Sequence, residues 1–150
     1  MKFLEIIENV RGNHPEINDN FISAGNLLDL CELPNQAGVY VLYSERQQFP
    51  YPWEFSGVFY IGKADNLNTR VIETHKKHTL AAKNNQRKGN SLYYPVYEYG
   101  ASYGVSCIYC LCENPKELEG ELLARFATVN GAIPVANRKH DAFWYLFPEL

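Results

Sequence analysis

The sequence predicts an α+β domain. Three segments, at 38–43, 55–61 and 105–112, have the β-branched and aromatic composition of strands, and two segments with apolar residues at helical spacing follow two of them. The 150 residues are enough for one domain with a core, and the 46% hydrophobic and 21% charged content is that of an ordinary globular protein. We therefore expect residues 1–150 to form a single domain.

The first 35 residues are expected to form an N-terminal helical extension that packs on the core. Residues 2–10 have apolar side chains at helical spacing, residues 11–24 are polar and predict a loop, and residues 25–33 predict a second short helix. Acids interrupt the apolar N-terminal stretch, which makes a poor signal peptide, and no apolar run approaches the roughly 20 residues of a membrane span. We expect a cytoplasmic protein with no membrane partner.

Two predicted strands in the first half of the chain each carry a tyrosine, Tyr40 in 38–43 and Tyr60 in 55–61. The connection between them, 44–56, is long and contains two prolines and four aromatic residues. Such a connection can contact a nucleic acid through stacking, but it more often packs its side chains on its own domain, and we expect the latter.

Gly62 ends the second tyrosine strand, and a helix is predicted over 67–78 because Asp65 or Asn66 can cap its start. The stretch from 70 to 88 contains six Lys or Arg residues and one acid, although the whole chain has a net charge of −3. A local basic face is compatible with binding a phosphate backbone, and a solvated helix and loop is the alternative. The candidate nucleic-acid-binding residues are Lys76, Lys77, Lys83, Arg87 and Lys88.

The second half predicts one more strand and one more helix. The tyrosine-rich stretch 93–103 is compatible with a nucleic-acid stacking platform, but half-buried β-structure is favoured. A strand is predicted over 105–112. A helix is predicted from Pro115 to about Val129, and residues 139–150 form an apolar C-terminal tail. The four cysteines lack metal-finger spacing and are expected to be free, mostly buried thiols.

Glu119 lies within the apolar stripe of the helix that begins at Pro115. At about 100° per residue it falls between Leu122 and Leu123. A carboxylate that faces a core needs a cation or strong hydrogen-bond donors. A divalent metal ion is one solution, and a salt bridge to Arg70 or Lys63 is the other. Tyr40 and Tyr60 on the two predicted strands lead us to favour the metal ion over the salt bridge.

These residues resemble the GIY-YIG nuclease family. Gly38-Val39-Tyr40 and Tyr60-Ile61-Gly62 give the paired signatures, and the segment from Tyr60 to Arg70 is similar to that of the bacterial excision-repair incision nuclease. Glu119 followed by two leucines, and then Pro134 and Asn137, continue the family's order of elements. The family often has a histidine or tyrosine four residues after the arginine. Here Thr74 occupies that position and His75 follows it.

The resemblance implies a three-stranded antiparallel sheet flanked by helices, a catalytic core over 36–138, and metal-dependent cleavage of DNA phosphodiesters. It implies that Glu119 holds one Mg²⁺ or Mn²⁺ ion, Arg70 and Lys63 neutralise phosphate charge, Tyr40 or Tyr60 activates a water, His75 relays the proton, and Asn137 orients the site. The two tyrosines remain equal candidates for the base.

Two alternatives to the nuclease remain. One is a catalytically silent nucleic-acid-binding module, and the other is a protein-interaction domain that uses the aromatic connection between the tyrosine strands. No residue pattern indicates the sequence or shape of the DNA, so branched or damaged DNA is a candidate substrate. The oligomeric state and the need for a partner protein are likewise not indicated.

Overall fold

The computed structural model describes residues 21–87 and 94–137 of the chain. The helix predicted over 2–10, the tail at 139–150 and the candidate DNA-binding residue Lys88 lie outside these ranges. Among the described residues, no helix has the length and apolar character needed to cross a membrane.

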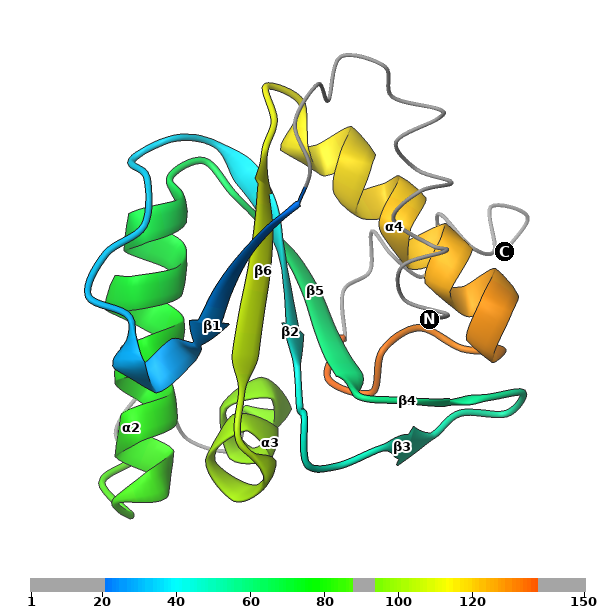
Figure 1. Cartoon of the computed structure of the whole chain (residues 1–150), viewed down its shortest axis with the longest axis horizontal. Coiled ribbons are helices and arrows are strands. Elements are labelled where there is room, and N and C mark those ends of the chain that lie inside the picture. Colours follow the sequence, from blue (N-terminus) through cyan, green and yellow to red (C-terminus); the bar gives the residue numbers. More distant parts are fainter. Residues whose placement is uncertain (1–20, 88–93, 138–150) are drawn as a thin grey trace.

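A four-stranded antiparallel sheet forms the centre of the described structure (Figure 1). The expectation of three strands is wrong by one, because residues 22–26, assigned to the N-terminal helical extension, form an edge strand that pairs with β6. The order across the sheet is β1-β6-β2-β5. The strands are β1 (Ile22–Asn26), β2 (Gly38–Tyr43), β5 (Val58–Ala64) and β6 (Ser106–Leu111).

The register between β2 and β5 fixes which side chains share a face. Tyr40 lies opposite Gly62, and Leu42 lies opposite Tyr60. Because side chains alternate along a strand and opposite residues share a face, Tyr40 and Tyr60 lie on one face of the sheet. Ile61, which follows Tyr60 in sequence, lies on the other face.

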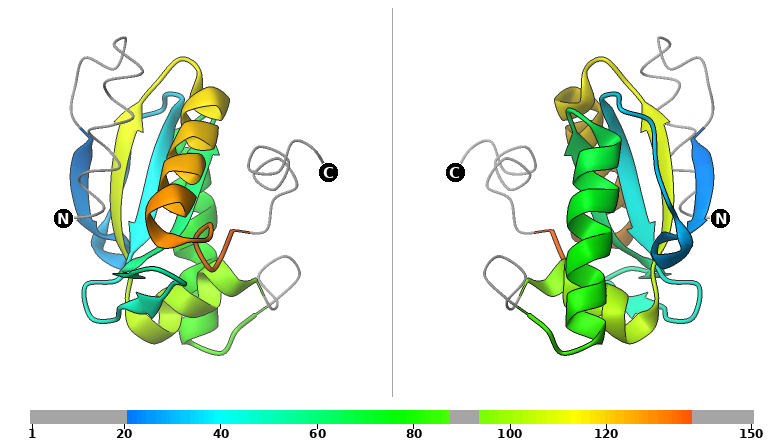
Figure 2. Two further views of the ribbon diagram at one scale, coloured as in Figure 1. Left: turned by 90° about the vertical axis from the view of Figure 1, so that its right-hand side faces the viewer. Right: turned by 90° about the vertical axis from the view of Figure 1, so that its left-hand side faces the viewer.

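Helices cover both faces of this sheet. Figure 2 shows the helix after β5 in front of the sheet in one view and α4 in front in the opposite view, so the two lie on opposite sides. The helix after β5 consists of η2 and α2 and is continuous. The helical elements are η1 (Leu27–Asp29), η2 (Asn68–Lys76), α2 (Lys77–Lys83), α3 (Pro95–Tyr103) and α4 (Pro115–Asn130).

The segment predicted as tyrosine-rich β-structure is a helix, α3. Pro95 occupies its first turn, where its missing N–H costs nothing, and Val96, Tyr97 and Gly100 form the buried face. The high β-propensity of tyrosine is outweighed here by packing against α2. The predicted helix over 25–33 is likewise wrong, since only the single turn η1 forms there.

The connection between β2 and β5 packs on its own domain, as expected. It contains a short hairpin of β3 (Phe49–Pro50) and β4 (Phe55–Ser56). The ring of Phe49 contacts the rings of Phe59, Tyr99 and Tyr103. Two of its aromatic side chains nevertheless remain in solvent, since Trp53 is 70% exposed and Phe55 63%.

The helix predicted from Pro115 is confirmed as α4, which ends at Gly131 with φ of +90°. Glycine favours this left-handed conformation because it has no Cβ. Leu118, Leu122, Leu123 and Phe126 are all buried, and α4 packs against β5 and β2. The four cysteines are free thiols, and burial raises the pKa of Cys107 to about 12.

Candidate functional site

The ring of Tyr40 lies across Gly62 on the neighbouring strand. A Cβ atom added at Gly62 would lie 2.5 Å from Cζ of Tyr40, 2.6 Å from its hydroxyl oxygen and 2.7 Å from Cε2 of Tyr60. Both tyrosines are buried, with exposed fractions of 0% and 6%, so neither ring can move aside freely. Gly62 has no side chain, and the Tyr40 phenol therefore occupies the space that a side chain would take at this position.

The helix that follows β5 begins with π-helical geometry over η2, in which hydrogen bonds join residues five apart. This spacing brings His75 to the side of the helix that carries Arg70. In an α-helix, Thr74 would be the residue one turn after Arg70. The Thr74 hydroxyl instead donates to the carbonyl of Thr69, at 3.1 Å. The wider turn explains how a histidine five residues after the arginine reaches the tyrosines.

His75 contacts Tyr40 through a short hydrogen bond. The Tyr40 hydroxyl and Nε2 of His75 are 2.6 Å apart, and His75 is 1% exposed. The His75 ring also lies 5.2 Å from the Tyr40 ring and 5.3 Å from the Tyr60 ring, centroid to centroid. Three aromatic groups from β2, β5 and η2 thus form one buried unit.

Arg70 supplies the positive charge of this unit. Burial acts to lower the pKa of Arg70, but charge and side-chain hydrogen bonding with Tyr40, and then with Tyr60, outweigh it and raise the pKa. Burial, followed by the neighbouring Tyr60, raises the pKa of Tyr40 well above its usual value, although Arg70 opposes this. The site therefore holds a permanent guanidinium cation next to a neutral, buried phenol.

Tyr97 of α3 is a member of the cluster that the sequence did not identify. It is 6% exposed, and its ring lies 5.5 Å from that of His75 and 5.0 Å from that of His78. Burial raises the pKa of Tyr97, and the charge of Arg70 acts to lower it, which indicates that the two lie close together. The only signal for Tyr97 in the sequence is the density of tyrosines over 93–103, and that density predicts β-structure.

Asn137 is joined to the same strand as Tyr60. The Ile61 amide donates to Oδ1 of Asn137 at 3.0 Å, and Nδ2 of Asn137 donates to the Ile61 carbonyl at 2.8 Å. The adjacent Ala136 amide donates to the Phe59 carbonyl. Because β5 is an edge strand, these bonds satisfy backbone groups that the sheet leaves free. Asn137 thus fixes the strand next to the tyrosine cluster.

Lys63 and Glu119 are the two predicted site residues that the described contacts do not join to the tyrosines. Lys63 lies opposite Val39, so its side chain leaves β5 on the face away from Tyr40. Glu119 is 3% exposed among the leucines of α4, as its position in the apolar stripe predicted. The helix α4 packs on β5 and β2, but on the side of the sheet opposite to the helix that carries Arg70 and His75 (Figure 2).

The described residues contain no cluster of protein ligands for a metal ion. No group of three or more His, Cys, Asp or Glu side chains able to hold a metal ion occurs within 21–87 and 94–137. Mg²⁺ accepts one or two protein carboxylates and completes its shell with water and substrate phosphate. Among the described residues Glu119 is the buried carboxylate, and an oxygen ligand of this kind suits Mg²⁺. This carboxylate does not fit a tetrahedral zinc centre.

Four of the candidate DNA-binding residues lie in the described part of the chain and line two pockets. Lys76, Lys77 and Arg87 line an open groove of about 1180 Å³ along the helix, whereas Lys83 lines a separate pocket of about 580 Å³ with Arg46. The Lys76 ammonium group donates to the Leu30 carbonyl at 2.5 Å.

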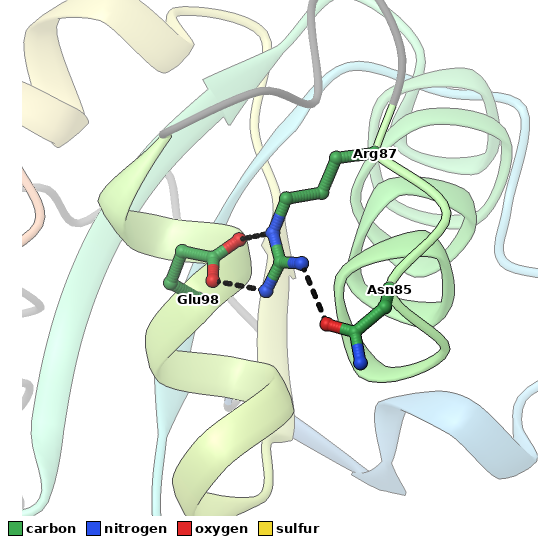
Figure 3. Close-up of polar contacts among 3 residues, drawn as sticks. All are labelled: Asn85, Arg87 and Glu98. Carbon is green, nitrogen blue, oxygen red and sulfur yellow. Dashed lines mark hydrogen bonds and ion pairs between the residues drawn. The ribbon is translucent and has the colours of Figure 1, made fainter.

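Arg87 is engaged in a pair of charge-assisted hydrogen bonds (Figure 3). Its Nε and Nη2 atoms each lie 2.6 Å from a carboxylate oxygen of Glu98, and Nη1 donates to Asn85. This hydrogen bonding lowers the pKa of Glu98. Arg87 therefore joins the end of α2 to α3, and its planar fork is already filled.

Comparisons of the chain with protein-family models, with curated proteins and with solved structures give no match.

Proposed function

We propose that the protein is a metal-dependent endonuclease that hydrolyses DNA phosphodiester bonds, as its resemblance to GIY-YIG nucleases implies. The observation that carries the proposal is the cluster of the buried Tyr40, Tyr60 and His75 with the half-buried Arg70, drawn from two adjacent strands and the following helix. The half-buried guanidinium of Arg70 interacts with both phenols and still reaches the surface, where an anionic group can meet it. A site that binds an anionic phosphate needs such a cation.

Arg70 binds the scissile phosphate. A guanidinium group presents parallel N–H donors that match two phosphate oxygens, and its charge is retained at any pH at which the protein is folded. In the described structure this charge is directed at the Tyr40 and Tyr60 phenols. The incoming phosphate takes up part of that hydrogen bonding, which leaves Tyr60 next to the reacting phosphorus.

Tyr60 is the phenol that orients the attacking water, because it keeps 6% exposure whereas Tyr40 has none. Tyr40 and His75 form the route by which the proton leaves. A neutral imidazole nitrogen accepts a proton more readily than a neutral phenol does, so His75 is the acceptor of this pair. Asn137 holds the backbone beside Tyr60 in position.

Glu119 is the residue that would hold a divalent ion. When bound, Mg²⁺ or Mn²⁺ would neutralise charge on the phosphate and assist departure of the leaving oxygen. The carboxylate is buried on α4, which covers the face of the sheet opposite to Arg70 and His75, so the proposal requires the ion and the phosphate to meet at an edge of the sheet.

The test is cleavage of supercoiled plasmid and of branched oligonucleotides with Mg²⁺ or Mn²⁺. We expect Arg70→Gln and Glu119→Gln each to lower the rate about 100-fold or more, the effect of removing one preorganised charge donor. Arg125→Gln and Glu117→Gln on the outer part of α4 are the matched controls and should retain activity. Absence of cleavage by the wild-type protein, or equal rates for Glu119→Gln and Glu117→Gln, would refute the nuclease assignment.

Two observations favour the alternatives. The complete burial of Tyr40 and near-complete burial of Glu119 favour a nucleic-acid-binding domain that does not cut. Binding that weakens with salt, without turnover in either metal, would support it. The exposed Trp53 and Phe55 favour a protein-interaction role for the β3–β4 hairpin. A Trp53→Ala variant that loses a partner protein but keeps DNA cleavage would separate that role from the site.

A further inference from the structure

A series of aromatic rings leads from the buried cluster to the surface. The His75 ring lies 5.5 Å from the Tyr97 ring, and the Tyr97 ring lies 5.8 Å from the Tyr94 ring. The exposed fraction rises along the series from 1% for His75 and 6% for Tyr97 to 52% for Tyr94. The last ring is thus held on one side by protein and is open to solvent on the other.

The fold of α3 supplies no structural reason for a tyrosine at position 94. Tyr94 stands just before Pro95, in the N-cap position, but its side chain makes no capping hydrogen bond. A short polar residue is preferred at such a position. The ring packs at an interplanar angle of 49° to Tyr97 and leaves half of its surface uncovered. One part of the Tyr94 ring thus contacts Tyr97, and the other part is in solvent.

Positive charge accompanies the rings. The charge of Arg70 acts on Tyr97, and the charge of Lys77 acts on His78, whose ring lies 5.0 Å from that of Tyr97. Lys77 is exposed and lines the groove along α2. Aromatic faces beside cations are the combination by which proteins bind single-stranded nucleic acid: the rings stack on bases and the cations contact the backbone.

We propose that Tyr94, supported by Tyr97, stacks on an unpaired base of the substrate next to the phosphate bound at Arg70. This inference rests on the proposed function and names its substrate class: nucleic acid with an unpaired nucleotide beside the cut, such as a single strand or a tailed duplex. In a continuous duplex both faces of each base are covered by neighbouring bases, so none is free to stack on Tyr94.

The test measures binding without cleavage. Fluorescence anisotropy in EDTA compares a single strand, a blunt duplex and a duplex with a single-stranded tail, and 2-aminopurine in the tail reports stacking by fluorescence quenching. We expect the wild type to prefer the single strand and the tailed duplex. Tyr94→Ala should bind these two about five- to tenfold more weakly and lose the quenching, as expected for a lost stacking contact. Binding to the blunt duplex should be unchanged.

Two controls separate stacking from general damage. Tyr94→Phe keeps the ring and should behave as the wild type. Phe55→Ala removes a similarly exposed ring from the β3–β4 hairpin and should also have no effect. Equal binding of all three nucleic acids, with Tyr94→Ala identical to the wild type, would overturn the inference. If Arg70-dependent cleavage then persists, the nuclease assignment stands without the stacking site. Tyr94-dependent quenching without cleavage in Mn²⁺ would leave the stacking site and refute the nuclease assignment.

Discussion

Replacing Gly62 by alanine tests the geometry on which the site depends. The added methyl carbon would lie 2.5 Å from Cζ and 2.6 Å from the hydroxyl oxygen of Tyr40. Contacts this short must be relieved by a shift of the ring or of the strand. The ring is fully buried and the strand is paired with β2, so neither shift is easy. Overpacking of this kind costs about 1–3 kcal/mol of folding free energy.

The substitution should also separate the Tyr40 hydroxyl from His75. That hydrogen bond is 2.6 Å long, and displacement of the ring by a few tenths of an ångström weakens it. We expect Gly62→Ala to lower the free energy of unfolding, measured by urea titration with circular dichroism, and to shift the NMR signals of the His75 ring. Phosphodiester cleavage should fall with it.

Gly25→Ala is the matched control. Gly25 has a φ of +83° but no atom within 4 Å of an added Cβ, so alanine there is strained without being crowded. The strain costs about 1–2 kcal/mol. Gly25→Ala should therefore lose stability while the His75 signals and the activity stay unchanged. If Gly62→Ala unfolds at the wild-type urea concentration with unshifted His75 signals, the Tyr40 ring does not lie across Gly62 and the description of the site is wrong.

Three further predictions concern the same cluster. Tyr40→Phe removes the hydroxyl bonded to a buried imidazole nitrogen and should cost about 1–3 kcal/mol in urea unfolding, with His75 kept in place by ring packing; no loss of stability would contradict the bond. Asn137→Ala removes both hydrogen bonds to the Ile61 backbone and should increase amide hydrogen exchange at Ile61 more than in the centre of β6; unchanged exchange would show that the edge is held otherwise. The Tyr40 phenol, whose pKa is raised by burial, should stay protonated after other tyrosines have titrated. The pKa of Tyr40 in the folded protein exceeds the unfolded value of about 10, so the contribution of Tyr40 to stability is constant below pH 10 and is lost as the pH rises toward the folded pKa. An ultraviolet phenolate titration in which no tyrosine titrates late would refute this.

Local signals in the sequence were sufficient for β2 and α4, whereas the strand predicted over 55–61 lies three residues later, as β5 (Val58–Ala64). The composition of 38–43 predicted β2 to the residue, and Pro115 and Gly131 mark the two ends of α4. The position of Glu119 within an apolar stripe predicted a buried carboxylate, and it is buried. These features depend on periodicity and on the backbone preferences of single residues, which act over a few positions.

Contacts between distant segments decided the rest. Residues 22–26 have no strand composition, and they form β1 because β6 offers an unpaired edge. The tyrosine-rich segment became α3 because it packs on α2. The π-helical geometry of η2 brings His75 to Tyr40, which is 35 residues away in sequence. The hydrogen bonds between Asn137 and Ile61 join residues that are 76 positions apart. The sequence alone determined which chemical groups the protein has and which strands and helices carry most of them. Only the tertiary structure decided which of those groups meet, because the energy of pairing and burial exceeds local preference wherever the two conflict.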